Sequence, residues 1–169
     1  LVGSEMCIRD RNTTYTFAPT PDNKCLFEIG GASLVISPST DTSIRVECAV
    51  LSGNSADYRC TADTNGRFSV VGKRVSSSSG NLRVEIRADI PDSCVLDLQT
   101  RGGSIKVGKH KAAINGDAGG GSIKIDEAGG PSTLHVSGGS IDVGVMSGSS
   151  LARASGGSIK FGTVSGPVD

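Results

Sequence analysis

Four cysteines offer the widest choice of chemistry in this sequence, because thiols can pack in a core, form disulfides or bind a metal. They are Cys25, Cys48, Cys60 and Cys94. All but Cys60 stand in phase with apolar residues of expected strands, which favours buried thiols. Their even number keeps one or two disulfides open as an alternative, with Cys60 in an expected loop. No pair has the Cys-x-x-Cys spacing typical of metal sites, so we expect no metal ligands.

Histidines and carboxylates are the second group that could do chemistry, and their placement does not indicate a catalytic site. His110 and His135 lack partners at ligand spacing on their own strands, and we expect both on the surface. Carbohydrate-cleaving β-helices gather their acids in one groove, whereas Asp117, Asp126 and Asp142 occupy three different positions of a repeat. We therefore expect no enzyme, no catalytic residues and no cofactor, and rank a polysaccharide-active enzyme third among three functional hypotheses.

A third set of polar residues recurs at one spacing and could bind a repeating polymer. The serines are Ser104, Ser122, Ser140 and Ser158, and two residues after them stand Lys106, Lys124, Asp142 and Lys160. Stacked repeats would align these side chains into an outward ladder, with a regular spacing that could match a glycan. The alternative is a solvated face that serves stability, because Asp142 between two lysines relieves like-charge repulsion along the ladder.

The ladder belongs to an internal repeat, which predicts the elements that position it. Gly-Gly-Ser-Ile begins at Gly102, Gly120, Gly138 and Gly156, 18 residues apart each time. The second residue after each isoleucine is again apolar and the one between is polar, which predicts a short, half-buried strand. A second glycine corner follows at Gly130, Gly148 and Gly166, and further strands are expected at 132–136 and 150–154.

One such unit cannot bury its own apolar face, but stacked copies can. We therefore predict an all-β fold, a β-solenoid or β-helix-like stack of 18-residue rungs. A sandwich of hairpins is the alternative, but it gives no reason for identical spacing. Residues 101–169 hold the regular repeats, and the sequence stops in mid-repeat, so we expect a truncated C-terminus.

The preceding residues, 12–100, alternate in the same way with looser spacing, and we expect them to form a strand-rich cap and the first coils. The expected strands are 26–29, 30–36, 44–50, 68–71, 82–86 and 95–98. Two stretches, 53–65 and the serine run 76–79, are expected loops. No segment has a sustained 3.6-residue apolar period, so we expect no long helix.

The first eleven residues, 1–11, resemble a translated transposase sequencing adapter over Leu1 to Asp10. Segments of this kind are artefacts and are excluded from fold prediction, which also removes Cys7. We expect the signal region of the natural protein to be missing from this sequence.

Composition and charge exclude several classes of function. The 17 Lys and Arg residues balance 17 Asp and Glu, whereas nucleic acids and anionic membrane surfaces attract basic proteins. The hydrophobic fraction of 36% is too high for a disordered chain, and no apolar stretch is long enough to span a membrane as a helix. With 24 Gly and 4% aromatics, the sequence indicates many turns and a core of aliphatic residues.

A family resemblance rests on the junction before the first rung. From Ile90 to Ile105 the residues are Ile-Pro-Asp-Ser-Cys-Val-Leu-Asp-Leu-Gln-Thr-Arg-Gly-Gly-Ser-Ile, and more Gly-Gly-Ser-Ile rungs follow. This arrangement resembles the bacterial putative-adhesin domain family over about residues 25–169. The resemblance implies a β-solenoid-like fold, a cell-envelope or extracellular location, and no catalytic residues to carry over.

The leading hypothesis is therefore a non-enzymatic, adhesin-like structural domain of the bacterial envelope or surface. Its partner would be a glycan, another envelope polymer, or a protein that binds the ladders or strand edges. The alternative is a ligand- or partner-binding module of an envelope-stress sensor or regulator.

Overall fold

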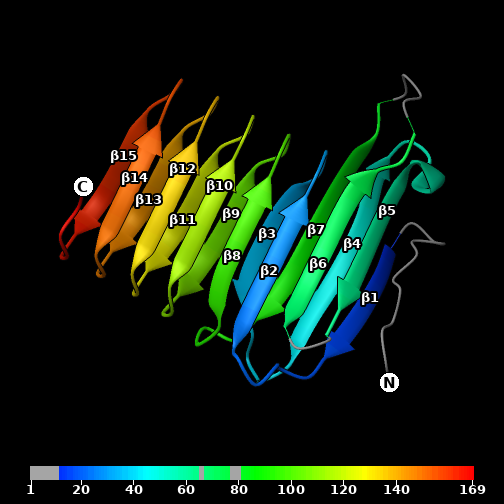
Figure 1. Cartoon of the computed structure of the whole chain (residues 1–169), viewed down its shortest axis with the longest axis horizontal. Helices are drawn as coiled ribbons and strands as arrows, with labels where there is room; N and C mark the ends of the chain where they lie inside the picture. The colour runs from blue at the N-terminus through cyan, green and yellow to red at the C-terminus, as the bar shows by residue number, and fades with distance from the viewer. Residues whose placement is uncertain (1–11, 65–66, 77–80) are drawn as a thin grey trace.

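The computed structural model describes residues 12–64, 67–76 and 81–169, and these residues form two β-sheets (Figure 1). The prediction of an all-β fold is confirmed, since the described helix is a single 3-10 turn, η1, at Ser55–Asp57. The adapter-like residues 1–11 and most of the serine run lie outside the described residues. Within the described ranges, no helix has the length and apolar character needed to cross a membrane.

The strands are short and most of them alternate buried and exposed residues, as period-two apolar patterns require. In chain order they are β1 Asn12–Phe17, β2 Lys24–Ile29, β3 Ser33–Pro38, β4 Ile44–Ser52, β5 Tyr58–Asp63, β6 Phe68–Arg74, β7 Arg83–Ile90, β8 Val95–Thr100, β9 Ile105–His110, β10 Ile114–Ala118, β11 Ile123–Ala128, β12 Ser132–Val136, β13 Ile141–Met146, β14 Ser150–Ala154 and β15 Ile159–Val164.

The strands divide between the two sheets in a regular order. Sheet A has eight strands in the order β1-β4-β7-β3-β9-β11-β13-β15, and sheet B has seven in the order β14-β12-β10-β8-β2-β6-β5. From β8 onward, consecutive strands fall in alternate sheets, so the chain crosses from one sheet to the other at every corner. Figure 1 shows the result, a long stack with β14 and β15 at one end and β1 and β5 at the other.

Equivalent residues of the repeats lie directly beside one another. In sheet A, Ile123 pairs with both Ile105 and Ile141, and Ile141 pairs with Ile159. In sheet B, Ile114 pairs with Leu96 and Ser132. All of these pairings are parallel, so the 18-residue spacing of the sequence becomes the strand-to-strand step of both sheets.

The inward side chains form one continuous core between the sheets. In the repeats the core is aliphatic, and Ile105, Ile123 and Ile141 are 1% exposed or less. At the other end it is aromatic, where the Phe68 ring lies 5.2 Å from that of Phe17 and 6.0 Å from that of Phe27. Ile159 of the last repeat is 41% exposed because β15 is the last strand of sheet A.

The Gly-Gly corners bring the main chains of successive repeats into close contact. A Cβ atom on Gly121 would lie 2.0 Å from the carbonyl oxygen of Gly103, and one on Gly139 would lie 2.2 Å from that of Gly121. No side chain fits at such a separation, so the second glycine of each pair is required by the stacking itself.

The N-terminal half is not stacked in chain order. β2 and β3 lie beside β8 and β9, and the later β6 and β7 lie beyond them. The far end is built from antiparallel pairs, β1 with β4, β4 with β7, and β5 with β6.

Two predictions for this half need correction. The expected loop 53–65 is wrong because it contains β5, whose alternation was too short to distinguish from a turn-rich stretch. The expected strand 30–36 begins only at Ser33, because Gly30 and Gly31 form a corner, with Gly31 at a φ of 72°.

Candidate functional site

The predicted binding ladder lies on the strands of sheet A. Lys106, Lys124, Asp142 and Lys160 are mutual partners in the parallel register of β9, β11, β13 and β15. They point away from the core, because each lies between two inward residues of its strand. The structure therefore brings these four residues together in one row.

The serines of the ladder are joined to one another. The main-chain N–H of Ser140 donates to Oγ of Ser122 at 3.1 Å, and that of Ser158 donates to Oγ of Ser140 at 3.3 Å. The N–H of Ser122 donates in the same way to Oγ of Ser104 at 3.4 Å. Each of these hydroxyls thus accepts a hydrogen bond from a main-chain N–H of the next repeat. These bonds link successive repeats and so stabilise the stack.

The charged row is only partly compensated. Lys124 Nζ lies 4.0 Å from an oxygen of Asp142, and both side chains are largely exposed. Lys106 and Lys124 are direct neighbours of like charge. The row therefore stays available to an anionic partner, but it lies on a sheet face and not in a concave site.

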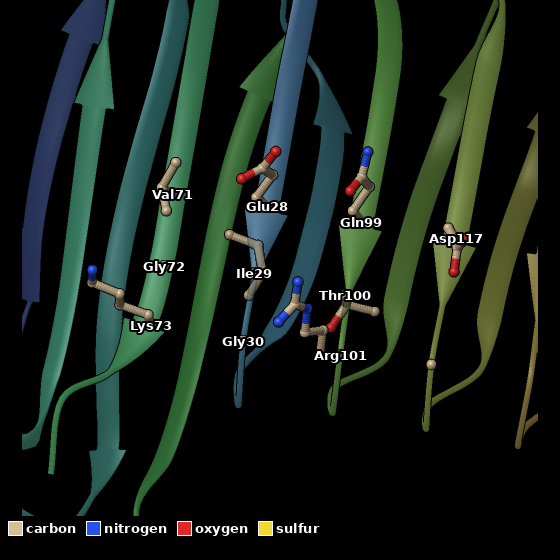
Figure 2. Close-up of a pocket in the computed structure, with 11 residues that line it drawn as sticks. Glu28, Ile29, Gly30, Val71, Gly72, Lys73, Gln99, Thr100, Arg101 and Asp117 are labelled. Atoms are coloured by element: carbon tan, nitrogen blue, oxygen red, sulfur yellow. The ribbon is translucent and has the colours of Figure 1, made fainter.

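A concave site lies instead on sheet B, along the carboxyl ends of β2, β6, β8 and β10 (Figure 2). It is a shallow groove of about 460 Å³, here called the sheet B groove. Its lining comprises Glu28, Ile29, Gly30, Val71, Gly72, Lys73, Gln99, Thr100, Arg101, Asp117 and Gly119.

Main-chain hydrogen bonds between neighbouring strands run along the floor of the groove. Gly30 donates its N–H to the carbonyl of Gly72 at 2.7 Å, and Gly119 donates to that of Thr100 at 2.8 Å. Arg101 donates its main-chain N–H to the carbonyl of Ile29 at 3.1 Å. These bonds hold the floor of the groove in place.

Three polar side chains of the groove come from one register row. Glu28 pairs with Gln99, and Gln99 pairs with Asp117, so their side chains follow one another on the outer face of sheet B. Figure 2 shows Arg101 and Lys73 nearer the strand ends. No ion pair found among the described residues involves the charged groups of Glu28, Lys73, Arg101 or Asp117.

The groove can therefore offer carboxylate acceptors, cationic donors and one amide side by side. Such a set can hydrogen-bond to the hydroxyl, amide or charged groups of a polar ligand. The prediction from the sequence missed this site. The available signal was the 18-residue recurrence of outward polar residues on the second strand, Gln99, Asp117, His135 and Arg153.

The two histidines differ in their surroundings. His135 lies on the outer face of β12, half-buried, beside Asp117 and Arg153. The prediction that His110 is on the surface is wrong, since its side chain is 2% exposed. Its Nε2 donates to the carbonyl of Cys94 at 2.6 Å, and burial lowers the pKa of the imidazole. The alternation of β9 breaks after Val107, since Gly108 is half-buried and Lys109 is exposed, so His110 faces inward.

The four described cysteines are buried free thiols, and Cys60 is part of β5 instead of a loop. Burial, with a neighbouring thiol, raises the pKa of Cys25. No group of three or more histidine, cysteine or acidic side chains that could hold a metal ion occurs within residues 12–64, 67–76 and 81–169. The expectation that the chain binds no metal or cofactor stays a prediction.

No protein-family model matches the chain, and no curated protein matches it. Among solved structures it is similar to a putative cell adhesion protein from Clostridium sporogenes ATCC 15579, with 12% identity, a TM-score of 0.44, and coverage of 93% of this chain and 97% of the other. A putative adhesin from Bacteroides fragilis NCTC 9343 has 11% identity, a TM-score of 0.26, and coverage of 93% and 95%. A putative adhesin from Parabacteroides merdae ATCC 43184 has 11% identity, a TM-score of 0.28, and coverage of 95% and 96%. At these values the similarities support neither a shared fold nor a shared function.

Proposed function

We propose that this chain is a non-enzymatic, adhesin-like structural domain of the bacterial cell surface or envelope. In this proposal the fold is a β-solenoid, residues 101–169 are its regular 18-residue rungs, and residues 12–100 form the first coils and the cap. The observation that carries the proposal is the unbroken parallel register from β9 to β15 and from β8 to β14.

A stack of this kind suits a mechanical role. Each repeat contacts only its neighbours, so length can be added without changing the cross-section. The core is continuous and the corners are held by main-chain bonds between repeats, such as Ser137 N–H to Ala118 O at 3.0 Å and Ser155 N–H to Val136 O at 2.9 Å. A rigid rod with fixed outer faces can present a binding surface at a distance from its attachment point.

The sheet B groove is the proposed binding surface, and its ligand is proposed to be a polar polymer such as an envelope glycan. The support is chemical: Glu28, Gln99 and Asp117 supply acceptors, and Arg101 and Lys73 supply donors without ion-pair partners among the described residues. Hydroxyl-rich polymers use both kinds of partner along an extended groove.

The test is a binding measurement with soluble bacterial envelope polysaccharides and peptidoglycan fragments, combined with an assay for released reducing ends. We expect saturable binding without release. The variant Glu28→Ala/Gln99→Ala should weaken binding at least about tenfold, since two polar contacts would be lost. The matched control is Lys106→Ala/Lys160→Ala on the sheet A ladder, which should bind like the parent chain.

Other outcomes separate the hypotheses. Loss of binding in the ladder variant alone would move the binding surface to Lys106 and Lys160 and overturn the groove. Release of reducing ends would overturn the non-enzymatic proposal. Antibody labelling of intact cells that carry the gene tests the location, and labelling only after permeabilisation would contradict it.

A further inference from the structure

All four described cysteines lie in the core, and they lie there in two pairs. Cys48 and Cys60 are 0% exposed, and Cys25 and Cys94 are 1% exposed. Cys48 and Cys60 lie close together, because their register partners, Ile86 and Gly72, face each other across the core, where a Cβ atom on Gly72 would lie 3.0 Å from Cδ1 of Ile86. Cys25 of β2 and Cys94, directly before β8, both point inward, and Cys25 is the register partner of Leu96, two residues after Cys94. The neighbouring thiol also raises the pKa of Cys48 and of Cys25. Four cysteines allow three connectivities in principle, and only one of them joins the cysteines that lie close together.

The pair Cys48 and Cys60 spans the two sheets. Cys48 belongs to β4 in sheet A and Cys60 to β5 in sheet B, and both side chains point inward. They lie at the antiparallel end of the stack, where β5 is the last strand of its sheet. A covalent link here would tie an edge strand to the opposite sheet.

The pair Cys25 and Cys94 lies within sheet B, at the point where the chain order is interrupted. Lys24 is the register partner of Val95, so Cys94 stands one residue before β8 and close to the start of β2. Cys94 is held in place by its own N–H bond to Pro91 O at 3.0 Å and by the His110 bond to its carbonyl. A covalent link here would join the first regular repeat to the inserted pair β2 and β3.

We propose that this chain carries two disulfides, Cys25–Cys94 and Cys48–Cys60, formed when it folds in an oxidising compartment. For each bond, two thiols give two electrons and, through the solvent, two protons to a disulfide oxidant such as glutathione disulfide, whose S–S bond breaks as the new one forms. The reaction passes through a mixed disulfide, and the oxidant leaves as two reduced thiols. The bonds fit the proposed surface location but do not depend on it or on the groove.

The timing of the reaction follows from burial. The thiolate is the reactive species, and desolvation and the neighbouring thiol both raise the pKa of Cys25 and of Cys48. With 0–1% exposure the folded thiols are also closed to reagents. Oxidation is therefore expected while the chain folds, and the folded reduced protein should react slowly with iodoacetamide.

The test uses the full chain with Cys7→Ser, because Cys7 lies outside the described residues and would add a fifth thiol. Reduced, denatured protein is refolded either with a glutathione redox buffer or with dithiothreitol, then unfolded in the presence of iodoacetamide. We expect no alkylation of the four cysteines and a mass about 4 Da lower after oxidative refolding. The reduced sample should take four alkyl groups. The oxidised form should also melt about 6–12 °C higher.

Trypsin resolves the connectivity without ambiguity. Cleavage after Lys and Arg leaves each cysteine on its own peptide, 25–45, 46–59, 60–67 and 88–101. The proposal requires a link of 25–45 to 88–101 and of 46–59 to 60–67. Four alkylated cysteines after oxidative refolding, or a link of 25–45 to 46–59 or 60–67, would overturn it.

Double variants test whether each cysteine forms a disulfide only with the cysteine that lies close to it in the fold. Cys48→Ala/Cys60→Ala should keep the Cys25–Cys94 link, and Cys25→Ala/Cys94→Ala should keep the other. The crossed control Cys25→Ala/Cys48→Ala leaves Cys60 and Cys94, which should both be alkylated. A link between those two would show that proximity does not select the partner. If a variant fails to fold, the tryptic peptide map of the chain that keeps all four cysteines still decides between the connectivities.

Discussion

The imidazole of His110 is bonded to the main chain of Cys94, with Nε2 lying 2.6 Å from the carbonyl oxygen. A carbonyl oxygen can only accept a hydrogen bond, so Nε2 carries the proton. The neutral imidazole can therefore make this bond without a second proton on the ring. His110 ends β9 and Cys94 precedes β8, so the bond connects the two sheets at the first regular repeat.

This bond leads to a prediction about pH. Burial lowers the pKa of His110 below its ordinary value of 6.5, and this outweighs the bond to Cys94 and the charge of Asp92, which act in the opposite direction. Below pH 6.5 the unfolded chain therefore takes up the proton first, and the free energy of unfolding falls as the pH falls. Above pH 6.5 both states are neutral and the contribution is constant.

The measurement is urea unfolding between pH 5.5 and 7.5, where the slope from one group is at most about 1.4 kcal/mol per pH unit. His110→Gln keeps a donor for the carbonyl but does not titrate, so its curve should be flatter below pH 6.5. Asp92 also forms an ion pair with Lys111 at 2.7 Å, and Lys111→Met controls for that neighbour. Parallel curves for the parent and His110→Gln would contradict the prediction.

The glycine corners predict a sharp contrast between adjacent positions. In Gly121→Ala the new Cβ would lie 2.0 Å from Gly103 O, so the two repeats must separate. In Gly120→Ala the nearest atom, Arg101 O, would be 3.7 Å away. We expect Gly121→Ala to cost about 2–3 kcal/mol and to lower the melting temperature by about 5–10 °C.

The control Gly120→Ala should stay within about 0.5 kcal/mol of the parent chain. Thermal unfolding followed by circular dichroism measures both. Equal losses in the two variants would mean that the close approach of the main chains is not what requires glycine at position 121.

The serine ladder predicts a smaller effect. Ser122→Ala removes the oxygen that accepts the N–H of Ser140, a bond of 3.1 Å between half-buried residues. We expect a loss of about 1 kcal/mol in the free energy of unfolding. Ser147→Ala, an exposed serine at a neighbouring corner, is the matched control and should change it by less than about 0.5 kcal/mol. Hydrogen exchange offers a second readout, since the Ser140 amide should lose protection in Ser122→Ala alone.

The charged row predicts a dependence on salt. Asp142 stands between Lys124 and Lys160 in register, so Asp142→Lys would give four consecutive cations on sheet A. Repulsion between exposed like charges should cost up to about 1 kcal/mol at low salt. At 1 M salt, where the screening length is about 3 Å, most of the loss should disappear. Asp142→Asn isolates the loss of the carboxylate, and a deficit that persists at 1 M salt would point to packing instead.

Much of the local structure could be predicted from the residues. Strands 132–136 and 150–154 were predicted with the bounds that β12 and β14 have, because turns flank them and their apolar residues alternate. The outward row at Lys106, Lys124, Asp142 and Lys160 was predicted in register, because an identical spacing leaves one way to stack. The short strands β1, β5 and β10 were not predicted, since β1 stands beside the excluded segment, β5 lies in a stretch rich in turn residues, and β10 contains a glycine.

The sequence by itself determined the all-β character, the period of the repeats and the inward or outward direction of most side chains. These properties depend on neighbours within a few residues or at one fixed spacing. Only the tertiary structure decided that β2 and β3 insert between β6–β7 and β8–β9, that His110 is buried, and which cysteines lie close together. It also created the sheet B groove from four strands. Such features depend on contacts between segments far apart in the chain. The free energy of these contacts determines which arrangement forms, and it cannot be inferred from the pattern of neighbouring residues.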